Sequence, residues 1–253
     1  MKFAGIIAEY DPFHNGHAWQ LAQAKALGAE RVAVAMSCSL VQRGALPLLP
    51  EAVRTRSALT CGADLVFALP APCACAGAEA FARAGVALLA AAGCDGLVFG
   101  AETPDAALLM EAAELLDSGS YRAALKAQLA GGARSFAAAR QAAAAQLASD
   151  ERVAALLDKP NNNLAVEYCR AIRSLAPRME AYPLPRQGAN HGEALHSAHG
   201  QFASASALRK LWAEGGADAV APYVPEAVFP LYQEAYAAGQ YTDFSAAGRC
   251  ELA

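Results

Sequence analysis

A short apolar run near the N-terminus is followed at once by a turn and a helix-forming segment, and this junction constrains the fold more than any other feature. Residues Phe3–Ala8 are apolar or glycine, as in a buried strand of a parallel sheet. Pro12 and Gly16 then predict a sharp turn. The segment from Ala18 to Leu27 has apolar side chains at helical spacing. The sequence therefore predicts a strand that leads directly into a helix N-terminus.

The same alternation of apolar runs and helix-forming segments continues along the chain. Strands are predicted at residues 31–36, 64–69, 96–99 and 179–184, and helices at residues 51–61, 79–92 and 159–176. Alternating strands and helices predict βαβ units on a parallel sheet, so we expect an α/β fold. Functional residues are then expected at the carboxyl ends of the strands.

One long stretch departs from this alternation. Residues 105–158 are almost wholly helical in character, with breaks near residues 118–119 and 131–132. We interpret this stretch as an inserted helical layer. A Gly-Gly pair follows a further helix beyond residue 204 and indicates a domain edge. The expected organisation is a main domain of residues 1–213 followed by a short helical extension of residues 214–253.

Residues 187–203 are rich in Gly and Ser and are predicted to form a loop beside the site. Three histidines lie there, at positions 191, 196 and 199, with Glu193 as the one nearby acidic residue. No Cys or second carboxylate follows at ligand spacing, so we predict a flanking loop rather than a metal site. The chain has 7 cysteines without zinc-type spacing. We interpret them as reduced thiols of a cytoplasmic protein.

Composition and charge exclude several classes of protein. The formal net charge is −4, which argues against a protein that coats nucleic acid nonspecifically. The hydrophobic content of 55% is largely alanine, and no uncharged run of membrane-spanning length occurs. The N-terminus leads straight into the first predicted strand, so no signal peptide is expected. Arg170, Arg173 and Arg178 form the arginine cluster that could contact RNA phosphates, with a solvated helix face as the alternative.

Two imidazoles lie at the predicted N-terminus of the first helix. His14 and His17 flank Asn15 and Gly16, directly after the first strand. Backbone N–H groups and the positive end of the helix dipole favour anions at such a place. Histidine side chains there can donate hydrogen bonds to phosphate oxygens during phosphoryl or nucleotidyl transfer. The junction therefore predicts a phosphate-handling site.

Residues 9–17 read EYDPFHNGH, and the HNGH within them resembles the signature of the HIGH-motif nucleotidyltransferases. The longer string resembles one branch, the tRNA(Met) cytidine acetate ligases. Further blocks agree with that branch in order and spacing: Met36-Ser37, Val41 to Gly44, Arg54-Thr55, Gly62 to Val66, Leu69-Pro70, Phe99 to Glu102, Lys159 to Asn162, Glu167-Tyr168 and Ser204 to Arg209. The resemblance covers residues 1 to about 212. It implies a Rossmann-like parallel sheet of the HIGH-motif type.

The resemblance also implies an enzyme of the nucleotidyltransferase type that acts as a ligase. Members of the family use ATP to activate acetate as acetyl-adenylate. They then pass the acetyl group to N4 of the wobble cytidine of elongator tRNA(Met). The partners implied are ATP, acetate or another small carboxylate, and tRNA, with Mg²⁺ expected on the ATP phosphates. No carboxylate can be assigned to that Mg²⁺, and no membrane is involved.

The site residues follow from the matching positions. His14 and His17 are the expected catalytic residues. Gly100 allows a nucleotide to approach the backbone, the amides of Asn161 and Asn162 could contact the adenine or ribose, and the second serine motif with Arg209 could hold the distal phosphates. The full set expected to bind ATP is Ile7, Ala8, Glu9, Tyr10, Asp11, Pro12, Phe13, His14, Asn15, Gly16, His17, Gly100, Asn161, Asn162, Arg186, Ser204, Ser206 and Arg209.

The sequence departs from the family pattern at several positions. Asp11 stands where the family usually has Asn, and Glu51 stands where a family lysine is expected. Family members also usually continue well beyond residue 253. An alternative therefore stays open: a nucleotidyltransferase that adenylylates a small metabolite without using RNA. The acidic pI of about 5.7 favours this alternative.

Overall fold

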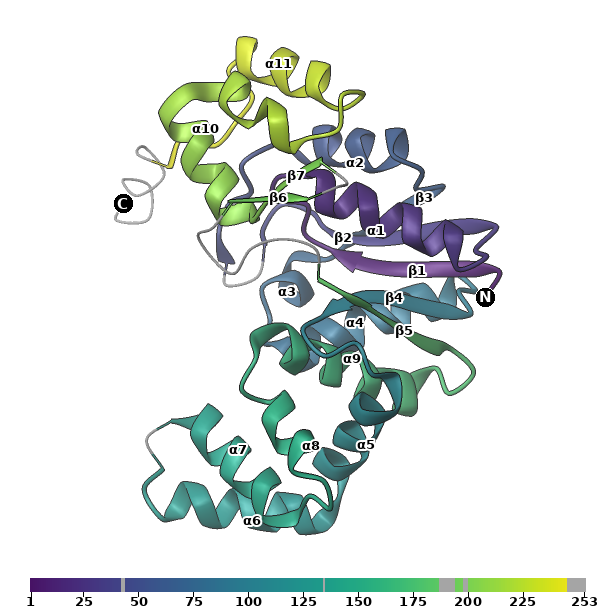
Figure 1. Cartoon of the computed structure of the whole chain (residues 1–253), viewed down its shortest axis with the longest axis vertical. Coiled ribbons are helices and arrows are strands. Elements are labelled where there is room, and N and C mark those ends of the chain that lie inside the picture. The colour runs from purple at the N-terminus through teal and green to yellow at the C-terminus, as the bar shows by residue number, and fades with distance from the viewer. Residues whose placement is uncertain (42–43, 134, 187–193, 198–199, 245–253) are drawn as a thin grey trace. The chain divides into compact units, whose positions relative to one another are not determined.

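Five parallel strands form the larger sheet of the described residues, in the order β3-β2-β1-β4-β5 (Figure 1). This description rests on a computed structural model of the whole chain, which describes residues 1–41, 44–133, 135–186, 194–197 and 200–244. The strands span Phe3–Ala8 (β1), Arg31–Ser37 (β2), Leu65–Leu69 (β3), Gly96–Ala101 (β4) and Glu180–Pro185 (β5). Each predicted strand is present to within two residues at either end. The parallel α/β fold expected from the sequence is therefore confirmed.

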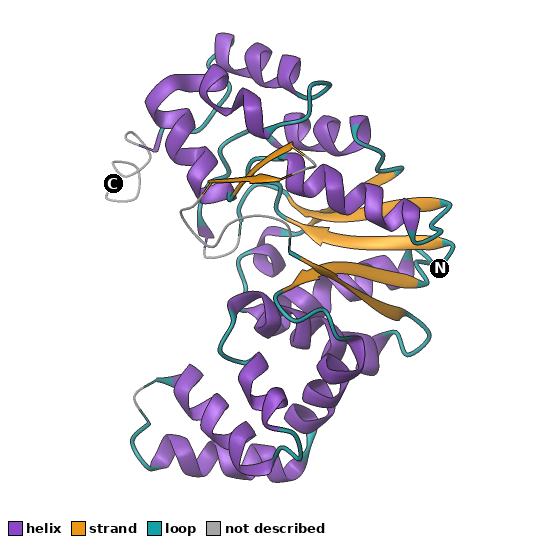
Figure 2. Cartoon of the chain, viewed as in Figure 1, coloured by secondary structure: helices purple, strands orange, loops and turns teal. Residues whose placement is uncertain are grey.

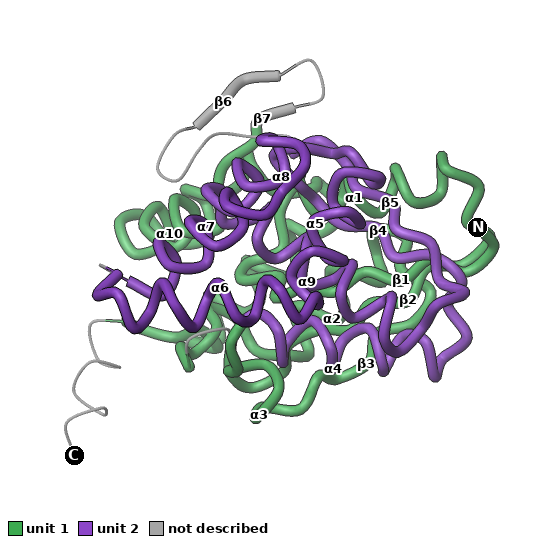
Figure 3. Tube along the Cα trace, turned by 90° about the horizontal axis from the view of Figure 1, so that it is seen from below, with its two compact units in different colours: residues 1–77, 187–253 green, residues 78–186 purple. Residues whose placement is uncertain are grey.

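The chain divides into two compact units (Figure 3). Unit 1 comprises residues 1–77 and 187–253, and unit 2 comprises residues 78–186. Figure 2, coloured by secondary structure, shows the strands with helices beside them.

Strands β1, β2 and β3 belong to unit 1. Ala4 of β1 pairs with Val32 of β2, and Ala33 of β2 pairs with Leu65 of β3. Residues 32–37 of β2, the middle strand of these three, are all buried. This burial explains why β2 reads as a continuous apolar run rather than as an alternating one. The helices that accompany these strands are α1 (Asn15–Ala26), α2 (Glu51–Thr60) and α3 (Ala71–Ala74).

The stretch predicted as a loop contains a short hairpin in unit 1, so that prediction was wrong in part. Strand β6 (Ala194–Ser197) pairs antiparallel with β7 (Gly200–Ala203). Four-residue strands are too short to produce a readable periodicity, and Gly and Ser made the segment resemble a loop. Phe202 of β7 is buried. Residues 187–193, 198 and 199 lie outside the described residues, as do the side chains of the three histidines in this stretch.

Helix α10 (Ala205–Val220) runs through the Gly-Gly pair that was expected to end it. Gly216 has a φ of +67°, and a Cβ there would lie 2.6 Å from a ring carbon of Tyr236. Glycine therefore allows the helix to kink where Tyr236 packs closely, instead of ending it. The short helix η2 (Ala221–Tyr223) and α11 (Phe229–Ala237) follow. Helix α11 packs against α10 and against α2.

Unit 2 contains β4, β5 and the helical layer predicted at residues 105–158. Its helices are α4 (Ala78–Ala91), α5 (Ala106–Asp117), α6 (Gly119–Ala130), α7 (Phe136–Leu147), α8 (Glu151–Leu156) and α9 (Pro160–Leu175). Side chains of Asp105, Ser118, Ser135 and Asp150 accept backbone N–H groups at the starts of α5 to α8. These N-caps separate the helices and explain the predicted breaks.

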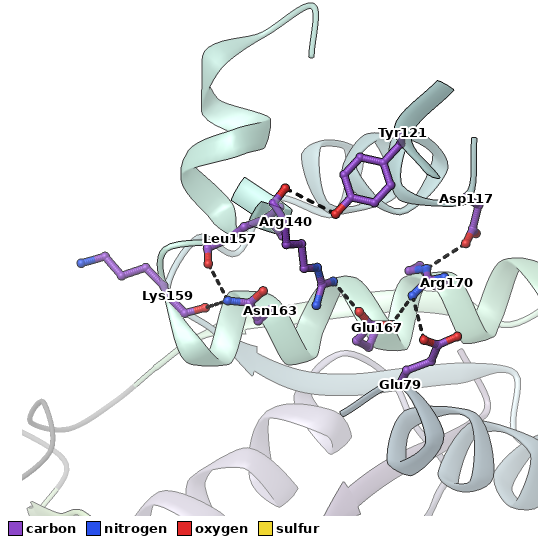
Figure 4. A network of polar contacts seen from close by, with 9 residues as sticks. All are labelled: Glu79, Asp117, Tyr121, Arg140, Leu157, Lys159, Asn163, Glu167 and Arg170. Atoms are coloured by element: carbon purple, nitrogen blue, oxygen red, sulfur yellow. Dashed lines mark hydrogen bonds and ion pairs between the residues drawn. The ribbon is translucent and has the colours of Figure 1, made fainter. Parts of the chain in front are cut away.

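A polar network joins the helices of unit 2 around one buried carboxylate (Figure 4). Glu167 of α9 pairs with Arg140 of α7 and accepts a bond of 2.7 Å from Arg170. Arg170 also donates through Nε to Asp117 at 2.8 Å and lies 3.5 Å from Glu79. The Arg170 guanidinium is therefore committed to three carboxylates. Arg170 is therefore not part of a solvated helix face, and its pairing with carboxylates makes it unsuited to bind RNA phosphates.

We expect Glu167→Gln to lower the free energy of unfolding by about 2 kcal/mol, because two half-buried guanidinium groups would then face a neutral amide. Urea denaturation measures this change. The matched control is Glu114→Gln, since Glu114 also faces an arginine, Arg173, but its side chain is 73% exposed. Its substitution should change stability by about 0.5 kcal/mol or less. Equal losses in the two variants would contradict the structural role given to the network.

Candidate nucleotide site

The turn between β1 and α1 is held in an unusual conformation by aromatic packing. Tyr10 has a φ of 50°, in the left-handed region that costs a residue other than glycine on the order of 1 kcal/mol. Its buried ring packs edge-on against Phe13 at 4.9 Å and against His17 at 4.8 Å, between centroids. The Asp11–Pro12 peptide is cis. The histidines follow at the start of α1.

The two histidines are each fixed by a backbone donor at the N-terminus of α1. His14 Nδ1 accepts from the N–H of Gly16 at 3.0 Å, and His17 Nδ1 accepts from the N–H of His14 at 3.3 Å. Their rings stack with centroids 3.8 Å apart. A neutral imidazole that accepts at Nδ1 carries its hydrogen on Nε2. Both rings therefore carry an Nε2–H donor at a helix N-terminus, as phosphate recognition requires.

Glycine is needed between the histidines for a steric reason. A Cβ at Gly16 would lie 2.9 Å from Cε1 of His14, which is closer than real Cβ contacts. Any other residue would push the His14 ring away from the Gly16 N–H that it accepts.

The start of α10 contributes the second group of expected phosphate ligands. Ser204 caps the helix by accepting from the N–H of Ala207 at 3.2 Å, and its hydroxyl lies 3.0 Å from that of Ser206. Nη1 of Arg209 donates to the backbone carbonyl of Asp11 at 2.6 Å and to its carboxylate at 3.0 Å. In unit 1, therefore, Arg209 links the serine motif to the loop that carries the histidines.

Asp11 is a buried structural acceptor in this loop. Its carboxylate accepts from the N–H of Leu48 at 2.6 Å as well as from Arg209. Burial raises the pKa of Asp11, while the bonds from Leu48 and Arg209 oppose the rise. Asp11 stands where the family usually has Asn, and its carboxylate pairs with Arg209.

Unit 2 brings together the other expected residues. A Cβ at Gly100 of β4 would lie 3.4 Å from Cγ of Arg186, which follows β5. The carboxylate of Glu102 accepts from the side-chain amide of Asn161 at 2.6 Å and from the N–H of Asn162 at 2.7 Å. Glu102 therefore caps α9, and it lies directly after β4.

Asn162 is buried, and its side-chain amide is already used. Its Oδ1 accepts from the N–H of Thr103 at 2.9 Å, and its Nδ2 donates to the Thr103 hydroxyl at 3.1 Å. A direct contact from Asn162 to a nucleotide would require these bonds to break. Asn161 also donates from its amide to Glu102, but it is only half-buried and is therefore the more accessible of the two amides.

Arg54 is a residue of this region whose role the sequence did not reveal. Its side chain is fully buried on α2. The guanidinium donates to the carbonyls of Leu49 at 3.0 Å, of Glu9 at 2.8 Å and of Ser37 at 2.6 Å. It also donates to the carbonyl of Cys38. Burial lowers the pKa of Arg54, and the charge of Asp11 opposes this shift most strongly.

Arg54 therefore ties the segments that follow β1 and β2 to the start of α2. The Arg54-Thr55 pair was one of the blocks that carried the family resemblance, yet nothing in it indicates a buried cation.

Among the ranges given above, no three His, Cys, Asp or Glu side chains gather as metal ligands. No helix in the same part of the chain is long and apolar enough to cross a membrane.

A family model described as HIGH nucleotidyl transferase matches residues 1–250. The chain belongs to this family. The HIGH nucleotidyl transferase fold expected from the first strand, turn and helix is thus confirmed, together with the resemblance on which that expectation rested.

The names of similar proteins are more specific than the name of the family. The chain is 41% identical over 218 residues to a tRNA(Met) cytidine acetate ligase of Syntrophotalea carbinolica, covering 85% of this chain and 52% of the relative. It is similar to the crystal structure of Thermotoga maritima TmcAL bound with alpha-thio ATP, at 30% identity and a TM-score of 0.85. The apo form of that protein gives 31% identity and a TM-score of 0.88. The two structures cover 95% of this chain, which spans 57% and 58% of theirs.

Proposed function

We propose that this chain uses ATP to activate acetate and transfers the acetyl group to N4 of the wobble cytidine of elongator tRNA(Met). A carboxylate oxygen of acetate attacks the α-phosphorus of ATP, pyrophosphate leaves, and acetyl-adenylate forms. The cytidine amine then attacks the acetyl carbonyl carbon, and AMP leaves. The observation that carries the proposal is the pair of stacked imidazoles, each accepting at Nδ1, at the N-terminus of α1. The names of the relatives support the choice of substrates.

The proposed roles follow from the donors of unit 1. The Nε2–H groups of His14 and His17 bind phosphate oxygens and stabilise the charge that develops on the α-phosphate during attack. The hydroxyls of Ser204 and Ser206, with the guanidinium of Arg209, bind the distal phosphates. A guanidinium has five N–H donors, and the bonds from Arg209 to Asp11 both use Nη1. The remaining N–H groups of Arg209 can therefore bind phosphate while Asp11 is held.

In unit 2, Gly100, Asn161 and Arg186 are the residues we propose for the nucleotide. Asn162 holds Thr103, in the segment after β4, rather than touching ATP. Mg²⁺ on the phosphates is part of the proposal, since it neutralises charge on the leaving pyrophosphate.

A second candidate function is adenylylation of a small metabolite without RNA. One observation favours it: the arginines expected to contact RNA, Arg170 and Arg173, are held by carboxylates of unit 2. The net charge of −4 points the same way.

Pyrophosphate release separates the two candidates. The purified chain is incubated with ATP, Mg²⁺ and acetate, with and without elongator tRNA(Met), and acetyl-adenylate and acetylated tRNA are measured by mass spectrometry. Acetate-dependent release with acetylated tRNA supports the proposal. Acetyl-adenylate without binding or acetylation of the tRNA favours the second candidate. Absence of acetate-dependent release contradicts the proposal.

If tRNA is the acceptor, the α6–α7 hairpin (residues 118–149) is the better candidate for phosphate contacts. These residues include Arg122, Lys126 and Arg134 but no Asp or Glu, while their fourth cation, Arg140, is paired with Glu167. Arg122 and Lys126 are exposed, one helical turn apart on α6. Phe136 of α7 is 61% exposed and could stack on an unpaired base.

We expect Arg122→Glu with Lys126→Glu to weaken tRNA binding by about tenfold or more at low salt, because two phosphate contacts become repulsive. Acetyl-adenylate synthesis without tRNA should not change. Fluorescence anisotropy with labelled tRNA measures the binding. Arg173→Glu is the control, since Arg173 already faces Glu114. A tRNA affinity that falls as much in the control would contradict the role of the hairpin.

A further inference from the structure

Side chains far along the sequence hold the loop that carries the histidines. Tyr232 of α11 donates its hydroxyl to the carbonyl of Phe13 at 2.6 Å. Asn15 donates to the carbonyl of Pro222, in η2, at 3.3 Å. Both contacts lie within unit 1 and join residues more than 200 positions apart. The loop is therefore fixed by the segment that follows α10, as well as by Arg209.

Burial and ring packing hold Tyr232 in this contact. Its side chain is fully buried, and its ring packs edge-on against Trp212 of α10 at 5.9 Å between centroids. Burial raises the pKa of Tyr232 far above its ordinary value, so the hydroxyl stays protonated and remains a donor. Helix α11 also packs on α2, which carries Arg54.

The carbonyl that Tyr232 holds belongs to the peptide group that fixes the catalytic ring. Phe13 C=O and His14 N–H lie in one planar peptide unit. That N–H donates to Nδ1 of His17 at 3.3 Å, the contact that defines the tautomer of His17. If the peptide plane rotates, the N–H leaves Nδ1, and this bond no longer sets the His17 tautomer that places the hydrogen on Nε2.

We propose that Tyr232 is a positioning residue of the nucleotide site, which orients the Phe13–His14 peptide and through it the His17 imidazole. This inference rests on the proposed function for its kinetic consequence, but its structural consequence can be measured independently. The fully buried Tyr232 is assigned no contact with substrate; its hydroxyl, which also contacts Ser57 of α2, acts on the site through the peptide plane.

The test is Tyr232→Phe, which removes one oxygen and leaves the ring. The matched control is Tyr236→Phe, one helical turn further along α11, where the ring is 44% exposed and stacks on Tyr241. We expect Tyr232→Phe to lower kcat for pyrophosphate release about tenfold, with a smaller change in KM for ATP. Tyr236→Phe should leave both unchanged. Thermal melts confirm that each variant is folded at the assay temperature.

Imidazole ¹⁵N spectra report the tautomer of His17. This tautomer should change if Tyr232 positions His17, and should stay the same if Tyr232 only stabilises the fold. The wild-type His17 should show an unprotonated Nδ1 and a protonated Nε2, assigned by the loss of its signals in a His17→Gln sample. In Tyr232→Phe the two His17 tautomers should mix, whereas Tyr236→Phe should match the wild type.

Both changes are required by the inference. A wild-type His17 spectrum or a wild-type kcat in Tyr232→Phe overturns it. If the wild-type chain releases no pyrophosphate, the proposed function fails, while the spectra of Tyr232→Phe and Tyr236→Phe still decide whether Tyr232 positions His17.

Discussion

Replacing His17 by alanine should slow acetate-dependent pyrophosphate release by a factor on the order of 100 or more, because one preorganised donor to the α-phosphate is lost. The Nδ1 of His17 is held by the N–H of His14, so its Nε2–H is directed before ATP binds. Stopped-flow or coupled-assay measurement of pyrophosphate gives the rate. Circular dichroism should show the wild-type fold.

The variant His17→Gln distinguishes the effect of the N–H donor from the effect of ring packing. In His17→Gln the side-chain amide can place an N–H near the position of Nε2, so we expect it to recover part of the rate lost in His17→Ala. The packing of the ring against Tyr10 and Phe13 is lost in both variants. Equal rates in the two variants would mean that the ring acts by packing alone. Near-normal release by a folded His17→Ala would remove His17 from the catalytic residues.

The strands and helices were predictable because each is encoded by its own residues. The run Phe3–Ala8 has the boundaries of β1, and β2 reads as an apolar run because residues 32–37 are all buried. The ends of α6, N-cap Ser118 and C-cap Gly131, are visible in the sequence as the predicted breaks near residues 118–119 and 131–132. The β6–β7 hairpin was missed because four-residue strands carry too little periodic signal.

The contacts that organise the site were not predictable, because their partners lie far apart along the chain. The bond from Tyr232 joins it to Phe13, and nothing near Tyr232 marks it as different from the exposed Tyr236. Arg170 shows the converse. From the sequence, Arg170 was predicted to be a basic helix residue that could contact RNA. In the structure its guanidinium contacts Asp117 and Glu167 instead.

Asn162 shows a third limit of the sequence. The block that contains it contributes to the family resemblance, from which we predicted nucleotide contacts by Asn161 and Asn162. In the structure, however, its amide is satisfied by Thr103. The motif therefore predicts a region for nucleotide contacts, but it does not predict which of the two neighbouring amides is buried and already hydrogen-bonded.

Arg54 is the position where we expect the largest loss of stability. Substitution by methionine keeps much of the length and removes the donors to four carbonyls, those of Glu9, Ser37, Cys38 and Leu49. Each buried carbonyl left unpaired costs roughly 1–3 kcal/mol, so Arg54→Met should destabilise the chain by about 4 kcal/mol or more. Urea denaturation monitored by circular dichroism measures the change.

Two further variants make the expectation specific to the buried guanidinium. Arg56→Met lies on the same helix, but its side chain is 61% exposed and it lies 3.8 Å from Glu234. Its effect should be about 0.5 kcal/mol or less. Arg54→Lys keeps a positive charge but has three donors on one nitrogen, so it can satisfy only some of the carbonyls and should fall between the other two. A stability of Arg54→Met within about 1 kcal/mol of the wild type would mean that water replaces the guanidinium. The segments after β1 and β2 would then be held by the aromatic packing of Tyr10 and by Asp11 rather than by Arg54.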